Sequence, residues 1–361
     1  MRLIRIGVIF DQKISVGGGY QQALNSALMV LKLPKELAEP VFFTTDEKNL
    51  STLETYGIKA INIKLSFFEK LREKFRRKIL DKHVLKIIKK IEKYSPFEKK
   101  LIKHKIDIVY FLSPTDLPQG LEKLNYITTL WDLCHRDEPE FPEVRDNKEF
   151  VRRDENFKKI LPSATAIIVD SEIGKSNVIN RYGADESRVH IIPFQAAQVI
   201  RNEIAPENKK KLLVKNKYNV NSYVFYPAQF WAHKNHIYII KGLHLLEERY
   251  GIKVDAIFSG VDKGNKKFVE SFVRKLQLEK RICFVGYVSD DELIELYRQS
   301  IALIMPSYFG PTNLPPLEAF KLGIPVLYPN KKGLRDQVGE AALLMDLNDP
   351  LTMTKHLKVL C

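Results

Sequence analysis

The sequence predicts a protein of class α/β, in which two doubly wound parallel sheets form two domains in tandem. Short runs of β-branched and aromatic residues alternate with helical patterns, which is typical of parallel sheets covered by helices. The alternation stops at a polar, lysine-rich stretch, Asn202–Lys217, and then restarts. A length of 361 residues suits two domains of ordinary size. We therefore expect domains at residues 1–200 and 201–361, with ligands bound at the carboxyl ends of the strands in the cleft between them.

In the first half, seven runs of four to eight residues have the composition of buried strands. They are Leu3–Phe10, Pro40–Thr45, Ala60–Ile63, Asp107–Ser113, Tyr126–Trp131, Ala164–Asp170 and His190–Pro193. Helical patterns fill most of the gaps between these runs.

The second half repeats the alternation. Its strand candidates are Tyr223–Ala228, Val254–Ser259, Ile282–Tyr287, Ile301–Pro306, Pro325–Tyr328 and Ala341–Met345. Helices are expected between them, near His236–Tyr250, Lys266–Leu276, Asp290–Gln299 and Pro315–Leu322. The repeated alternation predicts a second doubly wound domain.

Composition excludes several classes of protein. Apolar residues make up 45% and charged residues 28%, as in globular proteins rather than disordered or collagen-like chains. No apolar run approaches the roughly 18 residues of a membrane-spanning helix, and the amino terminus lacks the layout of a signal peptide. The three cysteines, Cys134, Cys283 and Cys361, lack the spacing of a disulfide framework or a zinc site. We therefore expect a soluble cytoplasmic protein.

The net charge of +14 is concentrated in one segment. Residues 64–105 contain 16 Lys and Arg against 5 Asp and Glu, which leaves a net charge of only +3 for the rest of the chain. Within this segment, two series of apolar residues recur at helical spacing: Phe68, Leu71, Phe75 and Ile79, then Leu80, Val84, Ile87 and Ile91. The segment therefore predicts basic amphipathic helices.

Such helices allow two interpretations. They can pack on their domain with a solvated lysine face, or they can contact anionic lipid headgroups or another polyanion. Nucleic acid is a disfavoured partner, because no base-reading motif accompanies the charge. The lipid interpretation predicts peripheral binding at the inner face of the membrane.

Three consecutive glycines, Gly17, Gly18 and Gly19, follow the first predicted strand and open a helix. Glycines let a backbone approach a ligand closely, and the amide groups at a helix amino terminus attract anions. A flexible turn is the alternative. The Gly-x-Gly-x-x-Gly spacing of a dinucleotide site is not present there.

The strongest local pattern lies between residues 306 and 326. A buried strand ends at Ser307, a loop of Gly, Pro and Asn follows, and a helix begins near Pro315. Such a loop presents amide groups and a positive helix end to an anion, while Glu318 in the first turns can accept hydrogen bonds from a diol. The alternative role of Glu318 is to cap its own helix.

With these patterns in order, the chain resembles the family-four, GT-B glycosyltransferases, which are retaining enzymes that use sugar nucleotides. The segments that carry the resemblance are Gly17–Gly19, Ser171 in Val169–Glu172, Ile191–Pro193, Tyr226–Ala228 with Lys234 and Asn235, Phe284–Val288 with Leu293 and Tyr297, and the stretch from Pro306 to Glu318. The resemblance implies a Rossmann-like acceptor domain and a Rossmann-like nucleotide-sugar domain. It also implies a reaction without a cofactor or an obligatory metal ion.

The resemblance assigns roles to individual positions. Glu318 matches the second Glu of a pair separated by seven residues, which binds the nucleotide ribose, and Lys234 matches the lysine that neutralises the donor diphosphate. A lysine and helix-end amides can stabilise the charge that develops when a nucleoside diphosphate departs. Tyr287 lies in the segment that borders the base, and the amides of Asn313 and Leu314, next to Thr312, match those that face the phosphates. Gly18 and Gly19 match a loop near the phosphate and the acceptor, and Gln229 is the remaining expected donor-binding residue.

Three positions depart from the family pattern. Gly310 replaces the first Glu of the pair, Gln229 stands where an arginine is usual beside the lysine, and Trp131-Asp132 replaces a His-Asp pair. These departures motivate an alternative, in which the chain is an inactive binding or scaffold relative of the transferases. The presence of Lys234 and Glu318 weighs against it.

The loop after the strand ending at Trp131 carries two candidate catalytic side chains. Asp132 and His135 can orient an acceptor hydroxyl or contact the sugar, with His135 standing in for the missing histidine. A loop-ordering Asp and an exposed His are the alternative. Two further histidines, His233 and His236, are expected to shape the donor pocket rather than to bind metal.

Together these patterns predict a retaining glycosyltransferase. It would move a hexose-type sugar from a nucleoside-diphosphate sugar to a glycan or lipid-linked acceptor, in polysaccharide or glycoconjugate biosynthesis. Lys234, Asp132 and His135 are its expected catalytic residues.

Overall fold

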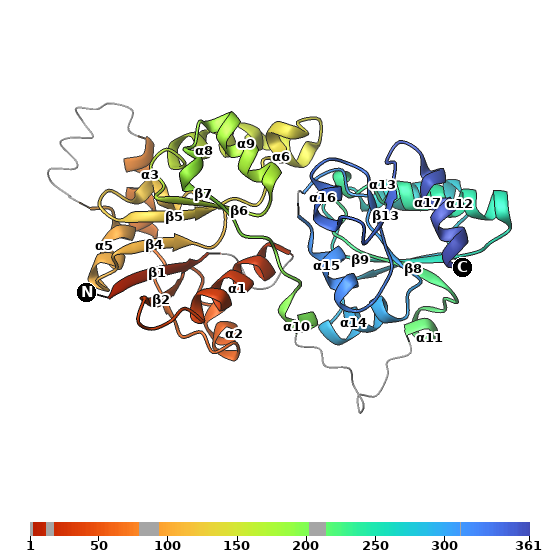
Figure 1. Ribbon diagram of the computed structural model, residues 1–361, viewed down its shortest axis with the longest axis horizontal. Coiled ribbons are helices and arrows are strands. Elements are labelled where there is room, and N and C mark those ends of the chain that lie inside the picture. The colour runs from red at the N-terminus through yellow and green to blue at the C-terminus, as the bar shows by residue number, and fades with distance from the viewer. Residues whose placement is uncertain (1–2, 12–17, 79–93, 202–213, 311) are drawn as a thin grey trace. The chain divides into compact units, whose positions relative to one another are not determined.

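The computed structural model describes residues 3–11, 18–78, 94–201, 214–310 and 312–361 (Figure 1). The chain forms two units. Unit 1 comprises Met1–Leu133 and Val151–Pro193, and unit 2 comprises Cys134–Phe150 and Phe194–Cys361. The main division thus falls before residue 200, and a segment from the first half of the sequence belongs by its contacts to unit 2.

Unit 1 is built on a parallel sheet of seven strands in the order β3-β2-β1-β4-β5-β6-β7. The strands are β1 (Ile4–Phe10), β2 (Ala38–Thr44), β3 (Ala60–Asn62), β4 (Ile108–Phe111), β5 (Asn125–Thr129), β6 (Ala166–Val169) and β7 (Val189–Ile191). Each overlaps the run predicted for it, so the predicted doubly wound first domain is confirmed. The strand order reverses between β1 and β4, and doubly wound sheets bind ligands at the carboxyl end of such a switch point.

Helices cover both faces of this sheet (Figure 1). Because alternate residues of a strand point to opposite faces, Val8 and Phe10 pack with α1 (Gly18–Leu31), whereas Ile9 packs in the core on the other side. The further helices of this half are α2 (Asn49–Thr55), α3 (Phe67–Lys78), α5 (Pro96–Lys103), η1 (Leu117–Gly120), α8 (Glu149–Ile160), α9 (Glu172–Tyr182) and η3 (Glu186–Arg188). Ser171 begins α9 by accepting a hydrogen bond from the Gly174 amide at 3.2 Å.

Unit 2 contains a second parallel sheet, of six strands in the order β10-β9-β8-β11-β12-β13. Its strands are β8 (Tyr223–Pro227), β9 (Asp255–Ser259), β10 (Ile282–Gly286), β11 (Leu303–Ile304), β12 (Val326–Pro329) and β13 (Leu343–Met345). Its helices are α10 (Gln198–Arg201), α11 (Val214–Tyr218), η4 (Ala232–Lys234), α12 (His236–Tyr250), α13 (Lys266–Lys275), α14 (Asp290–Arg298), α15 (Leu314–Lys321), α16 (Leu334–Val338) and α17 (Pro350–Leu360). The second doubly wound domain is therefore confirmed.

The sequence did not predict five of these helices, which are α10, α11, η4, α16 and α17. α11 begins inside the stretch that we expected to be an aperiodic linker. At the start of α17 the Leu351 amide donates a hydrogen bond to the Asp349 carboxylate at 3.0 Å, and the helix packs against α12. Gly242 of α12 lies at this contact, where an added Cβ would lie 2.0 Å from the terminal methyl group of Met353, so the Met353 side chain would have to shift.

The segment Cys134–Phe150 contains α6 (Cys134–Asp137), α7 (Pro142–Arg145) and η2 (Asp146–Lys148). It leaves the chain of unit 1 after β5 and returns to it in α8. We expected this segment in the first domain, but its contacts assign it to unit 2. The segment is held in unit 2 by side-chain contacts between residues that are 90 or more positions apart in the sequence. Local sequence patterns cannot predict contacts over such separations.

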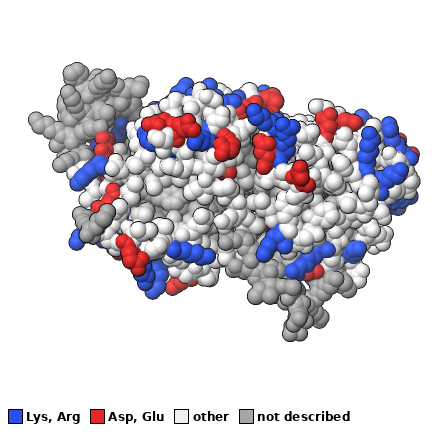
Figure 2. All heavy atoms as spheres, viewed as in Figure 1, with Lys and Arg blue, Asp and Glu red and all other residues white. Residues whose placement is uncertain are grey.

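Surface charge is mixed on the described residues. On the face in Figure 2, acidic and basic side chains are interspersed. No helix of the described residues is long and apolar enough to cross a membrane. Gly17 and the apolar series from Ile79 to Ile91 lie outside those residues.

Candidate functional site

Lys234 and Ser307 follow two neighbouring strands of the unit 2 sheet, β8 and β11, at their carboxyl ends. The Lys234 ammonium group lies 3.4 Å from the Ser307 hydroxyl and 3.3 Å from Oδ1 of Asn313, the N-cap residue of α15. The Lys234 carbonyl accepts a hydrogen bond from the Tyr226 hydroxyl at 2.9 Å. The lysine and the start of this helix therefore lie together in the structure.

Both the side chain and the backbone of Asn313 are hydrogen-bonded. Its Nδ2 donates to the Gly310 carbonyl at 2.8 Å and to the Tyr328 hydroxyl at 2.7 Å, and its backbone N–H donates to Oε1 of Gln337 at 2.9 Å. Gln337 in turn donates to the Asn313 carbonyl at 2.6 Å. This network fixes Oδ1 of Asn313 toward Lys234.

The network limits the anion site that the helix start can offer. The amide of Asn313 is already bonded to Gln337, and Pro315 and Pro316 have no N–H to donate. Leu314 is therefore the amide of this turn for which no hydrogen bond is seen among the described residues. Of the two amides that the sequence analysis directed at phosphates, Leu314 is left for that role.

Glu318 lies on α15 and is 6% exposed. It accepts a hydrogen bond from the Tyr297 hydroxyl at 2.8 Å, and the Ala197 backbone also hydrogen-bonds its carboxylate. Burial raises its pKa to about 7, although both hydrogen bonds oppose that rise. The partners of Glu318 lie on other elements, so this carboxylate does not cap its own helix.

Two predicted donor-binding residues, Tyr287 and Gln229, make no hydrogen bond or ion pair with this cluster in the described part of the chain. Tyr287 follows β10 and is 74% exposed. This exposure is compatible with a ring at the outer edge of a ligand site. Gln229 follows β8, and its Oε1 accepts a hydrogen bond from the Trp231 indole at 3.0 Å. Thr312 lies between Gly310 and the start of α15 and is partly buried.

Comparison with known proteins identifies unit 2. Residues 205–360 match the family described as Glycosyl transferases group 1. The C-terminal domain belongs to the group 1 glycosyl transferases. Because the match covers the elements from β8 to α17, it includes Lys234, the loop at Gly310 and Glu318.

The two-domain architecture is that of the GT-B glycosyltransferases. HepE from Anabaena, solved in complex with UDP, superposes with a TM-score of 0.70 over 99% of this chain and 89% of its own, at 16% identity. A glycosyltransferase from Rickettsia africae superposes with a TM-score of 0.67 over 100% of this chain and 88% of its own, also at 16% identity. At these identities the similarity establishes the fold.

Among curated proteins, O-antigen chain mannosyltransferase B from Escherichia coli is 25% identical over 254 residues, which is 70% of this chain and 64% of that protein. Mannosylfructose-phosphate synthase from Agrobacterium fabrum is 24% identical over 249 residues, 61% of this chain and 52% of that protein. The chain thus spans less than two thirds of the length of these relatives.

In this group 1 glycosyl transferase domain, Gly310 occupies the position of the absent motif carboxylate. Its φ of +99° lies in the region that favours glycine, and an added Cβ would lie 3.1 Å from Oδ1 of Asn313. A side chain there would be strained and would press on the partner of Lys234. The loop is therefore built around glycine.

In unit 1, the predicted glycines open α1 beside Trp131. An added Cβ on Gly19 would lie 2.6 Å from the Trp131 ring, so a side chain at this position would displace that ring. Gly18 is the first residue of α1 and is exposed.

The two candidate catalytic residues after β5 differ in their surroundings. Asp132, in unit 1, forms an ion pair with Arg153 of α8, and its carbonyl accepts a hydrogen bond from the same guanidinium group at 3.3 Å. His135, in unit 2, is fully buried and packs edge-on against Phe150 with ring centroids 5.5 Å apart. The alternative of an exposed His135 is therefore wrong.

An acidic residue that we did not predict, Asp11, lies at the switch point of the first sheet. Asp11 directly follows β1, and it accepts a hydrogen bond from the Ser113 hydroxyl, which follows β4. Burial raises the pKa of Asp11, against hydrogen bonds from Ser113 and Thr115 that lower it. The position of Asp11 could have indicated it, because Asp11 and Ser113 follow neighbouring strands at the point where the strand order reverses.

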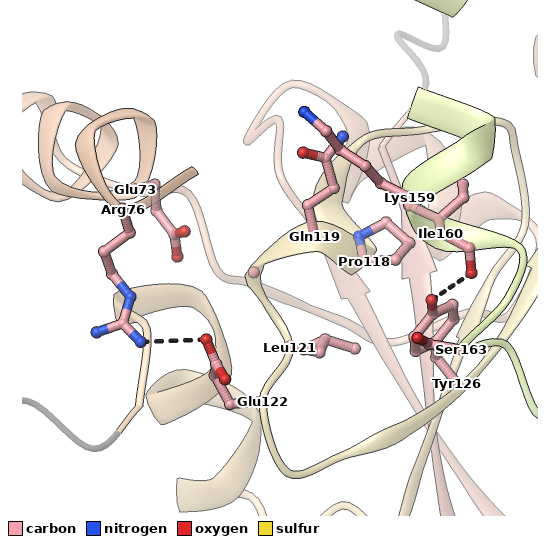
Figure 3. A pocket seen from close by; sticks show the side chains of 11 residues that line it. Glu73, Arg76, Pro118, Gln119, Leu121, Glu122, Tyr126, Lys159, Ile160 and Ser163 are labelled. Atoms are coloured by element: carbon pink, nitrogen blue, oxygen red, sulfur yellow. Dashed lines mark hydrogen bonds and ion pairs between the residues drawn. The ribbon is translucent and has the colours of Figure 1, made fainter. Parts of the chain in front are cut away.

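A cavity of about 280 Å³ lies elsewhere in unit 1 (Figure 3). Arg76 and Glu122 line one side of it, joined by an ion pair of 3.4 Å, and Tyr126 and Lys159 line another. Tyr126 stands at the amino end of β5, so this cavity is at the sheet edge opposite to the switch point. None of the predicted site residues lines it.

Proposed function

We propose that this protein is a retaining glycosyltransferase that moves a hexose from a nucleoside-diphosphate sugar to a glycan or lipid-linked acceptor. The observation that carries the proposal is the cluster of Lys234, Ser307 and Asn313 at the carboxyl edge of a group 1 glycosyl transferase domain. Relatives named as O-antigen chain mannosyltransferases or serotype-specific mannosyltransferases support a mannosyl donor in polysaccharide synthesis.

The proposed roles follow from the chemistry of each group. The Lys234 ammonium and the Leu314 amide stabilise the negative charge that develops on the departing diphosphate, in a position fixed before the reaction. Glu318, when ionised, accepts hydrogen bonds from the ribose hydroxyls. Tyr287 borders the base from outside, and Gln229 lies near the same strand end.

The acceptor side is proposed to lie at the switch point of unit 1. Asp11 and Asp132 offer carboxylates that can orient an acceptor hydroxyl, and the backbone at Gly18 and Gly19 allows close approach. The buried His135 is assigned to holding its segment rather than to proton transfer. Chemistry of this kind needs no covalent nucleophile from the protein.

The inactive alternative makes a different prediction. A binding protein would need the nucleotide contacts but not the Lys234 ammonium in its fixed position beside Asn313. We expect the protein to release nucleoside diphosphate from GDP-mannose in the presence of glycan or polyprenyl-linked acceptors, with a product that is one hexose heavier by mass spectrometry. A protein that binds nucleoside diphosphates but forms no product from any of several nucleoside-diphosphate hexoses would support the inactive alternative.

We further propose that residues 64–105 contact an anionic membrane surface, where a lipid-linked acceptor would be presented. On α3, Phe67, Phe68, Leu71 and Phe75 form an apolar stripe that is between 55% and 75% exposed. The opposite face of the same helix buries Glu73 and Arg76 instead. An exposed apolar stripe flanked by exposed lysines is typical of helices that lie in a lipid interface.

A further inference from the structure

We propose that Glu143, a residue from the first half of the sequence, is a positioning residue of the donor site. It fixes the turn in the second half that carries Lys234. The inference rests on the proposed function, because it takes Lys234 as the group that binds the donor diphosphate. Glu143 lies on α7, in the segment Cys134–Phe150 that belongs to unit 2. Its partners are 90 residues away along the chain.

The Glu143 carboxylate caps the short turn η4. Its Oε1 accepts the backbone N–H of His233 at 2.9 Å and also contacts Nδ1 of the same residue. The N-cap residue of the turn, Trp231, makes no side-chain capping bond, so Glu143 supplies the acceptor that the helix start needs. Because Lys234 is the next residue, this cap fixes the backbone from which its ammonium group reaches Asn313.

The carboxylate is held as an ion away from water. The Glu143 side chain is 7% exposed, and its Oε2 is buried without a hydrogen-bond partner among the described residues. Burial raises the pKa of Glu143, but hydrogen bonds from the His233 side chain and backbone lower it more, so the net pKa lies below its usual value. A buried carboxylate is costly unless it is paired, so the contact with His233 stabilises the buried Glu143 carboxylate.

His233 also contacts the loop that contains Gly310. Its ring stacks on Phe309, with centroids 3.8 Å apart and an interplanar angle of 14°. Its carbonyl accepts the Tyr308 amide at 2.9 Å. Glu143 thus connects, through one histidine, the turn that carries Lys234 and the loop that lacks the motif carboxylate.

Other contacts keep the segment in place independently of Glu143. The Phe141 ring lies 5.2 Å from the Tyr308 ring, and Glu138 pairs with Lys331, which also donates to the Tyr308 carbonyl at 2.9 Å. A change at Glu143 alone should therefore loosen the turn without detaching the segment. This expectation makes the role testable in a folded protein.

Calorimetry on the full chain can distinguish a positioning role of Glu143 from a general role in packing. GDP and UDP are titrated beside guanosine and uridine, so that the affinity added by the diphosphate is measured for each variant. Glu143→Ala should reduce that added affinity about tenfold, because a charge-assisted hydrogen bond that orders the turn is lost. Nucleoside affinity should stay within about twofold, since ribose and base contacts do not involve the turn. Glu140→Ala removes an exposed carboxylate of the same segment and should change neither affinity.

A second variant and a double-mutant cycle complete the test. Glu143→Gln keeps a carbonyl acceptor for the His233 amide but loses the charge, and should reduce the added affinity about threefold; it carries the test if Glu143→Ala does not fold. In a Lys234→Ala background, either change at Glu143 should have no further effect on diphosphate binding, because the group that it positions is gone.

The outcomes are distinguishable. If Lys234→Ala weakens diphosphate binding while both Glu143 variants bind as the wild type does, the positioning role is wrong and the proposed function stands. The same conclusion follows if the Glu143 and Lys234 effects are additive. If the wild type gains no affinity from the diphosphate, the proposed function itself fails.

Discussion

The ammonium group of Lys234 lies 3.3 Å from Oδ1 of Asn313, and this contact joins the turn after β8 to the start of α15. Asn313 is in turn tied to Gly310, Tyr328 and Gln337. The lysine is therefore presented by a network that is already complete without a ligand. Such preorganisation is what makes a fixed charge effective against a developing anion.

Asn313→Ala should disturb both stability and diphosphate binding. The change removes the side-chain bonds to Gly310 and Tyr328 and leaves Lys234 without that partner, which should lower the free energy of unfolding by about 1–3 kcal/mol. Urea denaturation measures this loss. Asn265→Ala is the matched control, because Asn265 is the N-cap residue of α13 but makes no side-chain capping bond. Equal effects of the two changes would show that the Asn313 network is energetically unimportant.

The raised pKa of Glu318 predicts a pH dependence of stability. The carboxyl binds a proton in the folded state up to about pH 7, but in the unfolded chain only below about pH 4.5. Its contribution is therefore fully favourable below the unfolded pKa, is lost as pH rises from about 4.5 to 7, and is constant above that. Relative to Glu318→Gln, the wild type should lose about 3 kcal/mol across this range. Parallel stability curves for the two proteins would contradict the burial argument.

The same group predicts the pH dependence of nucleotide binding. The ionised form of Glu318 accepts hydrogen bonds from the ribose hydroxyls more strongly than the neutral acid does, so nucleoside affinity should rise as pH increases through about 7. Glu318→Gln should weaken binding and flatten the profile. Calorimetry of guanosine and uridine at several pH values provides the measurement, and a wild-type affinity independent of pH would remove the ribose assignment.

Gly310→Glu tests whether the missing motif carboxylate is a lesion or part of a different loop. The positive φ and the nearness of Asn313 predict a cost of about 1–3 kcal/mol in stability and a loss of diphosphate affinity. Gly323→Glu is the control, since Gly323 also has a positive φ but open space around its Cβ position. Increased turnover in Gly310→Glu would instead identify Gly310 as a lesion that the variant repairs.

The exposed stripe of α3 predicts membrane binding that depends on both apolar contact and charge. Replacing Phe67, Phe68, Leu71 and Phe75 with Ser should abolish sedimentation with vesicles that contain anionic phospholipid, and high salt should weaken binding of the wild type. Phe268→Ser, an exposed phenylalanine in unit 2, is the control. Wild-type protein that fails to bind anionic vesicles at low salt would favour the solvated interpretation of this segment.

The sequence predicted the sheets well because buried parallel strands are continuous apolar runs, which are local features. All strands of both sheets overlap their predicted runs. The meeting of Lys234 with the start of α15 was also predictable, because both follow strands of one sheet at their carboxyl ends.

What could not be predicted depends on pairs far apart in the chain. The bond from the Asn313 amide to Gln337 reduced the amides available to an anion, and no local pattern contains it. Glu143 looks like an ordinary surface acid in sequence, yet it caps the turn at His233. Asp11 was overlooked because a single acid after a strand has no distinctive spacing, although its position at the switch point was available.

The most direct test of the account is turnover by Lys234→Ala. Release of nucleoside diphosphate is measured with a donor and an acceptor that the wild type converts, and circular dichroism verifies that the variant is folded. Removing a preorganised charge from the leaving-group site should lower turnover by about 100-fold to 1000-fold. A folded Lys234→Ala with wild-type turnover, or a wild type that binds donor and acceptor but turns over no faster than the variant, would contradict the account.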